Sequence, residues 1–191
     1  MKICVYGAAS NLINDKYIKK VEEIAETLAK RGHDLVFGAG ASGLMGAAAR
    51  GFKRGGAKIY GIIPHFFKTD TIEAIYEQCD KVIFTDTMRE RKSKMEELAD
   101  AFLIVPGGIG TFEEMFEIIT LKQLAQHKKP VAFYNIFNYY DTLMEFLEHC
   151  EREQFIREGC HNLYFSSDKN DEIIDYLENS KPVDLGIKDL K

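Results

Sequence analysis

The stretch Ala101-Phe-Leu-Ile-Val-Pro106-Gly-Gly-Ile-Gly-Thr111-Phe-Glu-Glu114 joins a short apolar run to a glycine-rich turn. Because the largely apolar residues 115–121 follow, the pattern predicts a strand, a turn and a helix that begins near Thr111. Closely spaced glycines allow positive φ values and let the main chain approach a ligand without Cβ obstruction. The unpaired N–H groups and the positive dipole end of the helix would point at this turn. The stretch therefore favours an anion site, most often one for a phosphate.

A plainer interpretation of the same residues stays open. The glycines could serve only a tight strand-to-helix connection, while Thr111 and Glu114 form a T-x-x-E capping box.

The composition limits the class of protein. A chain of 191 residues that is 46% hydrophobic is long enough for one well-buried domain and short for two. With 25 basic and 30 acidic residues it has no overall field for DNA or RNA, so no nucleic-acid partner is expected. No apolar run approaches the roughly 18 residues of a membrane helix, so no membrane partner is expected either.

The four cysteines are widely spaced and form no CxxC pair, which suggests neither a zinc site nor a disulfide framework. A reduced, cytoplasmic setting fits this pattern. The first residues predict a buried strand rather than a signal peptide, because their apolar run is short.

Strand and helix patterns alternate along the chain. Strands are expected at 2–6, 34–37, 58–63, 81–85, 101–105, 131–134 and 162–165, and helices at 17–31, 47–54, 87–99, 111–126, 139–153 and 171–179. A short helix is expected around Glu73–Gln78. This alternation predicts an α/β fold: a doubly wound, Rossmann-like parallel sheet with helices on both faces and a ligand crevice at the carboxyl ends of the strands. Residues 1–180 would form a single nucleotide-binding domain, followed by a weakly ordered tail at 181–191.

A second glycine turn, Gly38-x-Gly40-x-x-Gly43, matches the letters of a dinucleotide fingerprint. It follows the second expected strand rather than the first, and the next strand ends in Ile63-Pro64-His65 with no acid for a ribose hydroxyl. We therefore interpret it as a second close-approach turn on the same sheet edge and expect no NAD or FAD.

Arg91 lies on the apolar side of the helix expected at 87–99, in register with Met95. An inward arginine needs an anionic partner, because a buried unpaired charge is very costly. The alternatives are a structural salt bridge and a side chain that passes the core to reach solvent.

Glu113, Glu117 and Thr120 are spaced four and three residues apart on the helix after the glycine turn, so they share one side, and Glu114 lies close to that line. Acidic residues near a helix start gain only about 0.3–1 kcal/mol each from the dipole. Three glutamates around a glycine turn near Arg91 suggest a polar pocket instead.

Three motifs resemble one family in kind and in order. They are Gly38-Ala-Gly-Ala-Ser-Gly-Leu-Met-Gly46, Met88-Arg-Glu-Arg-Lys-Ser-Lys-Met95 and Pro106-Gly-Gly-Ile-Gly-Thr-Phe-Glu-Glu114. The chain resembles the LONELY GUY family, cytokinin riboside 5′-monophosphate phosphoribohydrolases often mislabelled as lysine decarboxylases, from Cys4 to about Phe155.

The resemblance implies an enzyme that hydrolyses the N-glycosidic bond of a nucleoside 5′-monophosphate, AMP or an N6-modified AMP, to free base and ribose 5-phosphate. Arg91 and Glu114 match the family's catalytic arginine and glutamate. The turn around Gly108, Gly110 and Thr111 would hold the phosphate, in agreement with the anion argument. The expected substrate-binding set is Gly43, Glu73, Lys92, Gly108, Ile109, Gly110, Thr111, Phe112, Glu113 and Thr120.

The sequence also departs from the family pattern. Arg89 stands where a histidine is common and Leu121 where a tryptophan is frequent, so the base side of the pocket can differ. The family's acidic substrate contact between the third and fourth strands has no clean match, and Glu73 is the candidate. The choice between plain and modified adenine therefore stays open.

The resemblance implies no metal and no cofactor, and it implies a homodimer that packs helices near the active site, which the apolar helix after the glycine turn would permit. A rival hypothesis is a nucleotide or molybdenum-cofactor carrier, because related folds bind without cleaving. A lysine decarboxylase would need a pyridoxal-binding lysine in a much larger fold, and none is indicated.

Overall fold

The computed structural model describes residues 1–68 and 74–181. Its strands are β1 (Lys2–Tyr6), β2 (Asp34–Phe37), β3 (Ile59–Pro64), β4 (Lys81–Thr85), β5 (Ala101–Ile104), β6 (Val131–Tyr134) and β7 (Phe165–Ser167). They form one seven-stranded sheet in the order β4-β3-β2-β1-β5-β6-β7, and every pair is parallel. The predicted doubly wound parallel sheet is confirmed.

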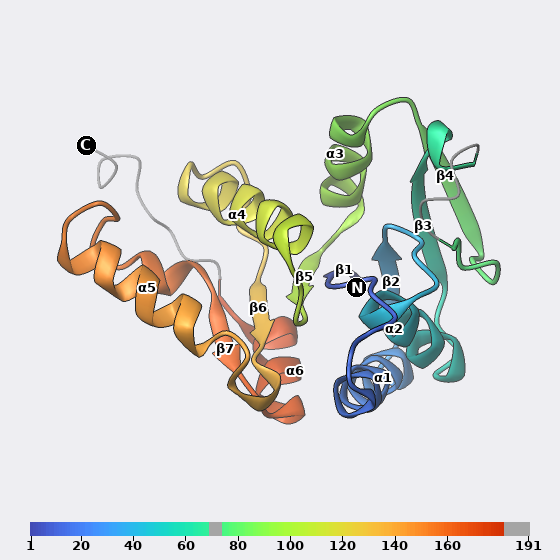
Figure 1. The fold of residues 1–191 in the computed structure, drawn as a ribbon, viewed down its shortest axis with the longest axis horizontal. Coiled ribbons are helices and arrows are strands. Elements are labelled where there is room, and N and C mark those ends of the chain that lie inside the picture. Colours follow the sequence, from blue (N-terminus) through green and yellow to red (C-terminus); the bar gives the residue numbers. More distant parts are fainter. Residues whose placement is uncertain (69–73, 182–191) are drawn as a thin grey trace.

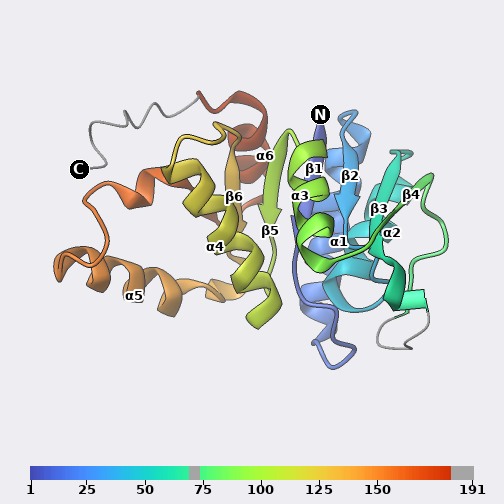
Figure 2. The same ribbon diagram turned by 90° about the horizontal axis from the view of Figure 1, so that it is seen from above.

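In the described part of the chain, six α-helices cover the two faces of this sheet, as Figures 1 and 2 show. On one face pack α1 (Asp15–Lys30), α2 (Gly43–Arg54) and α6 (Asn170–Asn179). On the other pack α3 (Met88–Leu98), α4 (Ile109–Gln123) and α5 (Asp141–Arg152). Three 3₁₀ turns, η1 (His65–Lys68), η2 (Ile136–Asn138) and η3 (Cys160–Leu163), lie in the connections. No helix within the described ranges is long and apolar enough to cross a membrane.

The alternation of side chains along each strand divides the core into two layers. In β1, Ile3 and Val5 pack under α1 and α2, whereas Cys4 and Tyr6 pack under α3 and α4. All four side chains are buried because the parallel sheet is covered on both faces.

The direction of winding reverses between β1 and β5. The chain adds β2, β3 and β4 on one side of β1, and then β5, β6 and β7 on the other. Tyr6, at the end of β1, pairs with Ile104 at the end of β5. In open α/β sheets a reversal of this kind leaves a crevice beyond the carboxyl ends of the strands, which is where ligands bind.

Two elements differ from the sequence-based expectation. The last strand was expected at 162–165, but residues 160–163 form η3 and the strand begins at Phe165, which pairs with Ala132. Gly159 adopts a left-handed conformation (φ 85°) and its carbonyl accepts from the Asn162 N–H at 2.9 Å, so the chain closes a turn before it extends.

The short helix expected at 73–78 is wrong for its described residues, 74–78. Ile75 forms a β-bridge with Gly40, and the flanking Ala74 and Tyr76 exchange main-chain hydrogen bonds with Ala41 and Ala39 at 2.8 Å. The segment is thus extended because it pairs with the glycine turn after β2. Glu73, and the tail from position 182 onward, lie outside the described residues.

Candidate active site

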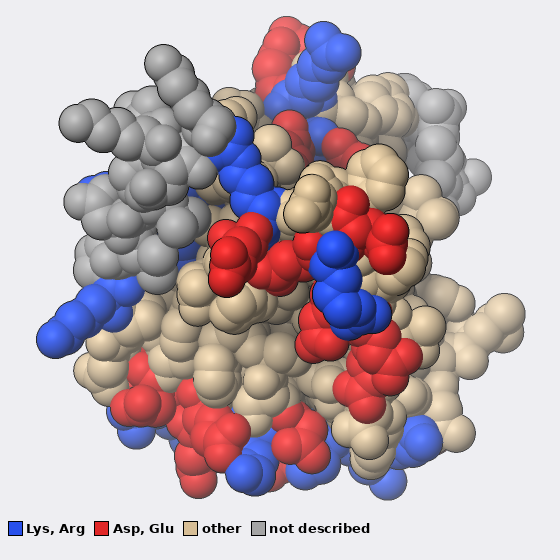
Figure 3. All heavy atoms as spheres, turned by 90° about the vertical axis from the view of Figure 1, so that its left-hand side faces the viewer, with Lys and Arg blue, Asp and Glu red and all other residues tan. Residues whose placement is uncertain are grey.

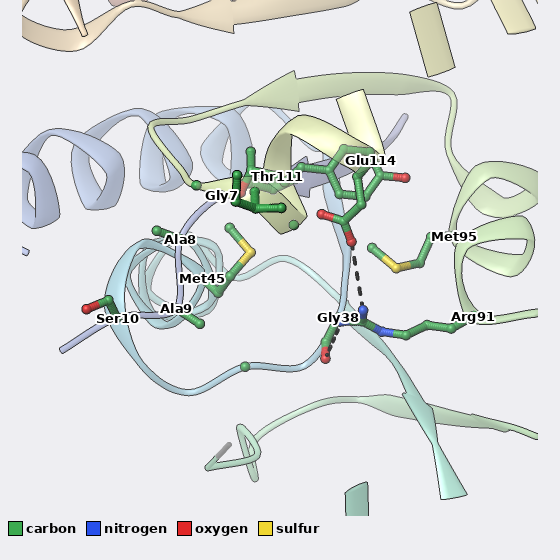
Figure 4. A pocket seen from close by; sticks show the side chains of 16 residues that line it. Gly7, Ala8, Ala9, Ser10, Gly38, Met45, Arg91, Met95, Thr111 and Glu114 are labelled. Carbon is green, nitrogen blue, oxygen red and sulfur yellow. Dashed lines mark hydrogen bonds and ion pairs between the residues drawn. The ribbon is translucent and has the colours of Figure 1, made fainter. Parts of the chain in front are cut away.

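A cavity of about 410 Å³ opens at the crevice between β1 and β5. Its walls come from the turn after β1, the turn after β2, helix α3 and the first turns of α4 (Figure 4). The lining residues are Val5, Tyr6, Gly7, Ala8, Ala9, Ser10, Gly38, Gly40, Met45, Arg91, Met95, Gly108, Ile109, Gly110, Thr111 and Glu114. The two glycine turns singled out in the sequence therefore meet at one site, together with the turn of small residues after β1.

Helix α4 starts two residues earlier than its sequence suggests. Its first residue is Ile109 and its N-cap is Gly108, which offers no side-chain cap. Thr111 lies inside the helix, so the alternative T-x-x-E capping box is not formed. The first amide groups of α4 are left without a capping side chain and face the cavity, the arrangement that favours an anion.

The three glycines at the start of α4 differ in the space around them. A Cβ at Gly107 would lie 2.1 Å from Thr111 Oγ1, so only glycine lets the buried Thr111 pack against this turn. At Gly108 and Gly110, by contrast, a Cβ would meet no atom within 4 Å. The glycine turn thus leaves open space directly at the helix start.

Arg91 points inward from α3, as its helical position predicts, and is only 9% exposed. Its Nε donates to the Ile62 carbonyl and its Nη2 to the Gly38 carbonyl, each at 3.2 Å. Nη1 lies 3.8 Å from Glu114 Oε1 (Figure 4). Two carbonyl acceptors and one carboxylate therefore hold the guanidinium at the cavity wall.

Glu114 lies one helical turn after Thr111, so both side chains reach the cavity. Burial raises the pKa of Glu114 to about 7, because an ionised carboxylate loses its water there; Arg91 opposes this rise, whereas Glu113 adds to it. The carboxyl group is thus divided between its two protonation states near neutral pH. Such a group can both accept and donate a proton.

Lys92, the neighbour of Arg91, connects α3 to α4 outside the cavity lining. Its ammonium group forms ion pairs with Glu113 and, at 2.6 Å, with Glu117 Oε2. These glutamates raise the pKa of Lys92, although burial, the largest single influence, acts against them. The link fixes α3 against the first turns of α4 and thereby the separation of Arg91 and Glu114.

The other sequence-predicted site residues are dispersed. Ile109 lines the cavity and is 83% exposed, whereas Phe112 packs into the core beneath α4. Thr120 lies two turns further along α4 on the exposed surface. Gly43 has φ 54°, and a Cβ there would lie 2.7 Å from the Ala8 and Ser10 carbonyls. Gly43 thus brings the turn after β1 against the start of α2.

Sequence reasoning did not assign several residues of the cavity. Tyr6, Met45 and Met95 line it, although each reads in the sequence as an ordinary core residue. Met95 carries the one usable signal, since it follows Arg91 by four positions and so shares its side of α3. Within the described ranges, no cluster of three or more His, Cys, Asp or Glu side chains could hold a metal ion.

Comparisons with known proteins identify the family of the chain. Residues 45–177 match the model of a family described as "Possible lysine decarboxylase". The chain is 35% identical to the cytokinin riboside 5′-monophosphate phosphoribohydrolase LOG2 of Arabidopsis thaliana, over 95% of this chain and 84% of that protein. It is also 35% identical to the cytokinin riboside 5′-monophosphate phosphoribohydrolase LOG of Oryza sativa subsp. japonica, over 95% of this chain and 74% of that protein.

Solved structures support the fold. A molybdenum cofactor binding protein from Rippkaea orientalis superimposes with a TM-score of 0.69 and 19% identity, over 93% of this chain and 94% of that chain. The molybdenum cofactor carrier protein of Chlamydomonas reinhardtii gives the same TM-score and identity, over 93% and 95%. At this identity the likeness concerns the fold alone. By its sequence matches, however, the chain belongs to the LONELY GUY family, whose model is described as possible lysine decarboxylase and whose plant relatives are named cytokinin riboside 5′-monophosphate phosphoribohydrolases.

Proposed function

We propose that this protein hydrolyses the N-glycosidic bond of a nucleoside 5′-monophosphate, AMP or an N6-modified AMP, and releases the free base and ribose 5-phosphate. The observation that carries the proposal is the pair formed by Arg91 and Glu114, 3.8 Å apart, beside the uncapped start of α4. An anion-binding helix start next to a carboxyl group that titrates near neutrality suits a phosphate-anchored substrate whose reaction develops positive charge.

In this proposal the 5′-phosphate binds at the turn formed by Gly108, Gly110 and Thr111. The amide groups at the start of α4 and the hydroxyl of Thr111 donate to its oxygens. Because Gly108 and Gly110 have open space where a Cβ would stand, the phosphate can approach the main chain closely. Such anchoring would separate monophosphates from nucleosides that lack the phosphate.

The proposed role of Glu114 follows from its protonation. As the bond from C1′ to the base nitrogen breaks, the ribose becomes an oxocarbenium-like cation, which the carboxylate form stabilises. The same carboxylate orients a water molecule toward C1′ and accepts its proton as the new C–O bond forms. The base nitrogen that leaves with the bonding electron pair takes up the proton that Glu114 accepted from water, so the carboxylate is regenerated and the products are the neutral base and ribose 5-phosphate. A pKa of about 7 keeps enough of the carboxylate form at neutral pH.

Arg91 is proposed to act beside this carboxylate. Two main-chain carbonyls hold its Nε and Nη2, so Nη1 is directed toward the cavity and Glu114. The guanidinium would favour the ionised form of Glu114 and donate to phosphate or ribose oxygens.

We further propose a homodimer in the cytoplasm. Helix α5 has no buried residue, and Phe146 on it, Leu124 at the end of α4 and Phe155 after α5 are 60%, 50% and 86% exposed. Figure 3 views the side that carries α5, where uncharged side chains lie among acidic ones. A second copy covering α4 and α5 would remove these apolar groups from water. The free cysteines of the chain suit a reducing compartment.

The test is chromatography of products after incubation of the purified protein with AMP, isopentenyl-AMP, GMP, CMP and adenosine. Release of base and ribose 5-phosphate from monophosphates, but not of base from adenosine, is the expected result and would rank the bases. Binding without release would replace the proposal with a carrier role.

A further inference from the structure

Two neighbouring tyrosines bind the main chain of the turn between β5 and α4. Tyr139 and Tyr140 lie between η2 and α5, far along the chain from this turn. The Tyr140 hydroxyl donates to the Val105 carbonyl at 2.8 Å, and the Tyr139 hydroxyl donates to the Gly107 carbonyl at 2.7 Å. The connection between β6 and α5 therefore holds the turn at two points.

The turn needs such support because of its own sequence. Gly107, Gly108 and Gly110 have a wide choice of φ and ψ, so ordering them costs more conformational entropy than ordering other residues. A binding site gains affinity when its donors are already aimed at the ligand before the ligand arrives. The Ala8 N–H adds a third bond to the turn, since it donates to the Pro106 carbonyl at 3.1 Å. Bonds from outside the turn thus supply the order that its glycines lack.

The hydrogen bond from Tyr139 sets the direction of one amide group. The Gly107 carbonyl and the Gly108 N–H belong to the same peptide unit, which is trans, as are all others in the described part of the chain. In a trans peptide these two groups point in opposite directions. Fixing the carbonyl toward Tyr139 therefore aims the Gly108 N–H away from Tyr139. Because Gly108 lines the active-site cavity and Tyr139 does not, this N–H is directed toward the cavity.

The same carbonyl also bears on where α4 begins. The first main-chain bond of the helix runs from the Phe112 N–H to the Gly108 carbonyl at 2.9 Å. A helix that began one residue earlier would pair the Thr111 N–H with the Gly107 carbonyl, four residues before it. In the structure the Gly107 carbonyl accepts from Tyr139 instead. The Thr111 N–H thus stays among the unpaired amide groups of the helix start.

The segment that carries the two tyrosines is strained and firmly held. Phe137 and Asn138 both adopt left-handed conformations, with φ of 54° and 61°, which are unfavourable for residues other than glycine. The side chain of Asn135 holds this bend, because its Oδ1 accepts from the Tyr140 N–H and its Nδ2 donates to Asp141 Oδ1, each at 2.7 Å. Such strain persists where surrounding contacts hold it, often at functional sites. Here the bend brings both tyrosine hydroxyls to the turn.

We propose that Tyr139 is a positioning residue for the substrate phosphate: its hydroxyl fixes the peptide unit of Gly107 and Gly108 so that the Gly108 N–H donates to a phosphate oxygen. The inference rests on the proposed function, because it takes the turn as the phosphate site. A hydrogen bond to the carbonyl also polarises the peptide unit and makes its N–H a stronger donor. Tyr139 is 43% exposed, whereas Tyr140 is buried, so the hydroxyl of Tyr139 can be removed without disturbing the core.

The experiment measures calorimetric Kd values for AMP and for adenosine, in a Glu114→Gln background that prevents turnover during the titration. The ratio of the adenosine Kd to the AMP Kd reports what the phosphate contributes to binding. Tyr139→Phe removes only the hydroxyl and keeps the ring that packs edge-on against Tyr17, 6.3 Å between centroids. It should lower this ratio about 3- to 30-fold and leave the adenosine Kd unchanged, because a charge-assisted hydrogen bond to the phosphate is weakened.

Tyr176→Phe is the matched control. The Tyr176 hydroxyl is also hydrogen-bonded to the main chain, at Val131, but Tyr176 lies on α6 and packs on the other face of the sheet from α4. Its loss should keep the ratio of the two Kd values. In the protein that retains Glu114, Tyr139→Phe should raise KM for AMP by the same factor with kcat nearly unchanged, because the phosphate contact is equally strong before and during bond cleavage.

A ratio that Tyr139→Phe leaves unchanged would overturn the proposal. An equal loss of affinity for AMP and adenosine would overturn it too, because that result would show a general structural role without direction toward the phosphate. Cleavage of AMP by the wild type together with an unchanged ratio would leave the proposed function in place and remove only this inference. If the wild type cleaves no nucleotide but the ratio falls as expected, the proposed function fails and the role of Tyr139 in phosphate binding stands.

Discussion

The guanidinium of Arg91 occupies the space in which residue 38 would carry a side chain. A Cβ built on Gly38 would lie 1.6 Å from Arg91 Nη2, the same nitrogen that donates to the Gly38 carbonyl. The glycine turn after β2 and the arginine of α3 are therefore one unit, although they are 53 residues apart. The turn that matches the letters of a dinucleotide fingerprint thus has a glycine at position 38 because the Arg91 guanidinium fills the space beside it.

Gly38→Ala should displace Arg91 and damage both stability and catalysis. The added methyl group cannot coexist with the guanidinium, so we expect a loss of about 1–3 kcal/mol in the free energy of unfolding, together with a large loss of AMP cleavage. Urea denaturation of Gly38→Ala, Arg91→Ala and the double variant forms a double-mutant cycle. In the Arg91→Ala background the added methyl group has room, so Gly38→Ala should then lower the free energy of unfolding only slightly. If the losses in the free energy of unfolding of the two single variants simply add in the double variant, residue 38 and the Arg91 guanidinium do not compete for the same space.

The pH dependence of kcat/KM should report Glu114. Its pKa is raised to about 7, and the proposed chemistry uses the carboxylate. The rate should therefore rise about tenfold per pH unit below pH 7 and level off above it. Because a phosphate monoester itself titrates near pH 6, Glu114→Gln measures the contribution of the substrate alone. Thr111→Val weakens phosphate binding but keeps the carboxylate, so it should keep the step near pH 7. A profile that falls as pH rises through 7 would show that the protonated acid is the required form.

The same raised pKa predicts a stability cost at alkaline pH. The folded protein keeps the Glu114 proton up to about pH 7, whereas an unfolded glutamate loses it near 4.5, so this group's contribution to stability declines as pH rises between these values. Glu114→Gln mimics the protonated form. It should exceed the wild type by roughly 1–3 kcal/mol in urea denaturation at pH 8 and match it near pH 4.5. A difference independent of pH would refute the assigned pKa.

An ion-pair cluster away from the site should respond to pH in the opposite direction. Glu178 on α6 accepts from Arg31 Nε at 2.8 Å and lies 2.7 Å from His33 Nε2, which ties α6 to the end of α1. Hydrogen bonds from Arg31, the largest influence, lower the pKa of Glu178 to about 2. Its stabilisation is therefore complete above pH 4.5 and is lost as pH falls toward 2.

Glu178→Gln should accordingly destabilise the protein by about 1–2 kcal/mol at neutral pH, less than the pKa shift alone implies because Arg31 is half exposed and solvent screens the pair. The deficit should shrink when thermal unfolding is repeated at pH 3. Lys169, which pairs with Glu172 at the exposed start of α6, supplies the control: Lys169→Gln should change stability far less.

Much of the fold could be predicted from the sequence because its signals are local. Apolar runs bounded by turns locate six of the seven strands to within a residue, as with Lys2–Tyr6 and Val131–Tyr134. The helix expected from Thr87 is also capped by that residue, since Thr87 Oγ1 accepts from the Glu90 N–H at 3.1 Å. Such caps depend only on residues three positions apart.

The errors have non-local causes. Residues 74–76 are extended because they pair with the turn after β2, a partner that no helical periodicity can indicate. In the site, the inward Arg91 follows from helical phase alone, and Thr111 with Glu114 follows from their spacing. Two other contacts depend on how distant segments pack, so neither could be predicted. They are the hydrogen bond from Arg91 to the Gly38 carbonyl and the one from the Tyr139 hydroxyl to the Gly107 carbonyl.

The measurement that tests the central claim most directly is the single-turnover rate of AMP cleavage in the wild type, Glu114→Gln and Glu97→Gln. Glu97 is an exposed acid on α3 that pairs with Lys94, so it controls for the loss of one carboxylate. Removal of the carboxylate that stabilises the oxocarbenium and orients the water should slow cleavage about 10²–10⁴-fold in Glu114→Gln and leave Glu97→Gln at the wild-type rate. Equal rates of base and ribose 5-phosphate release in all three proteins would contradict the assignment of this site as a phosphoribohydrolase centre.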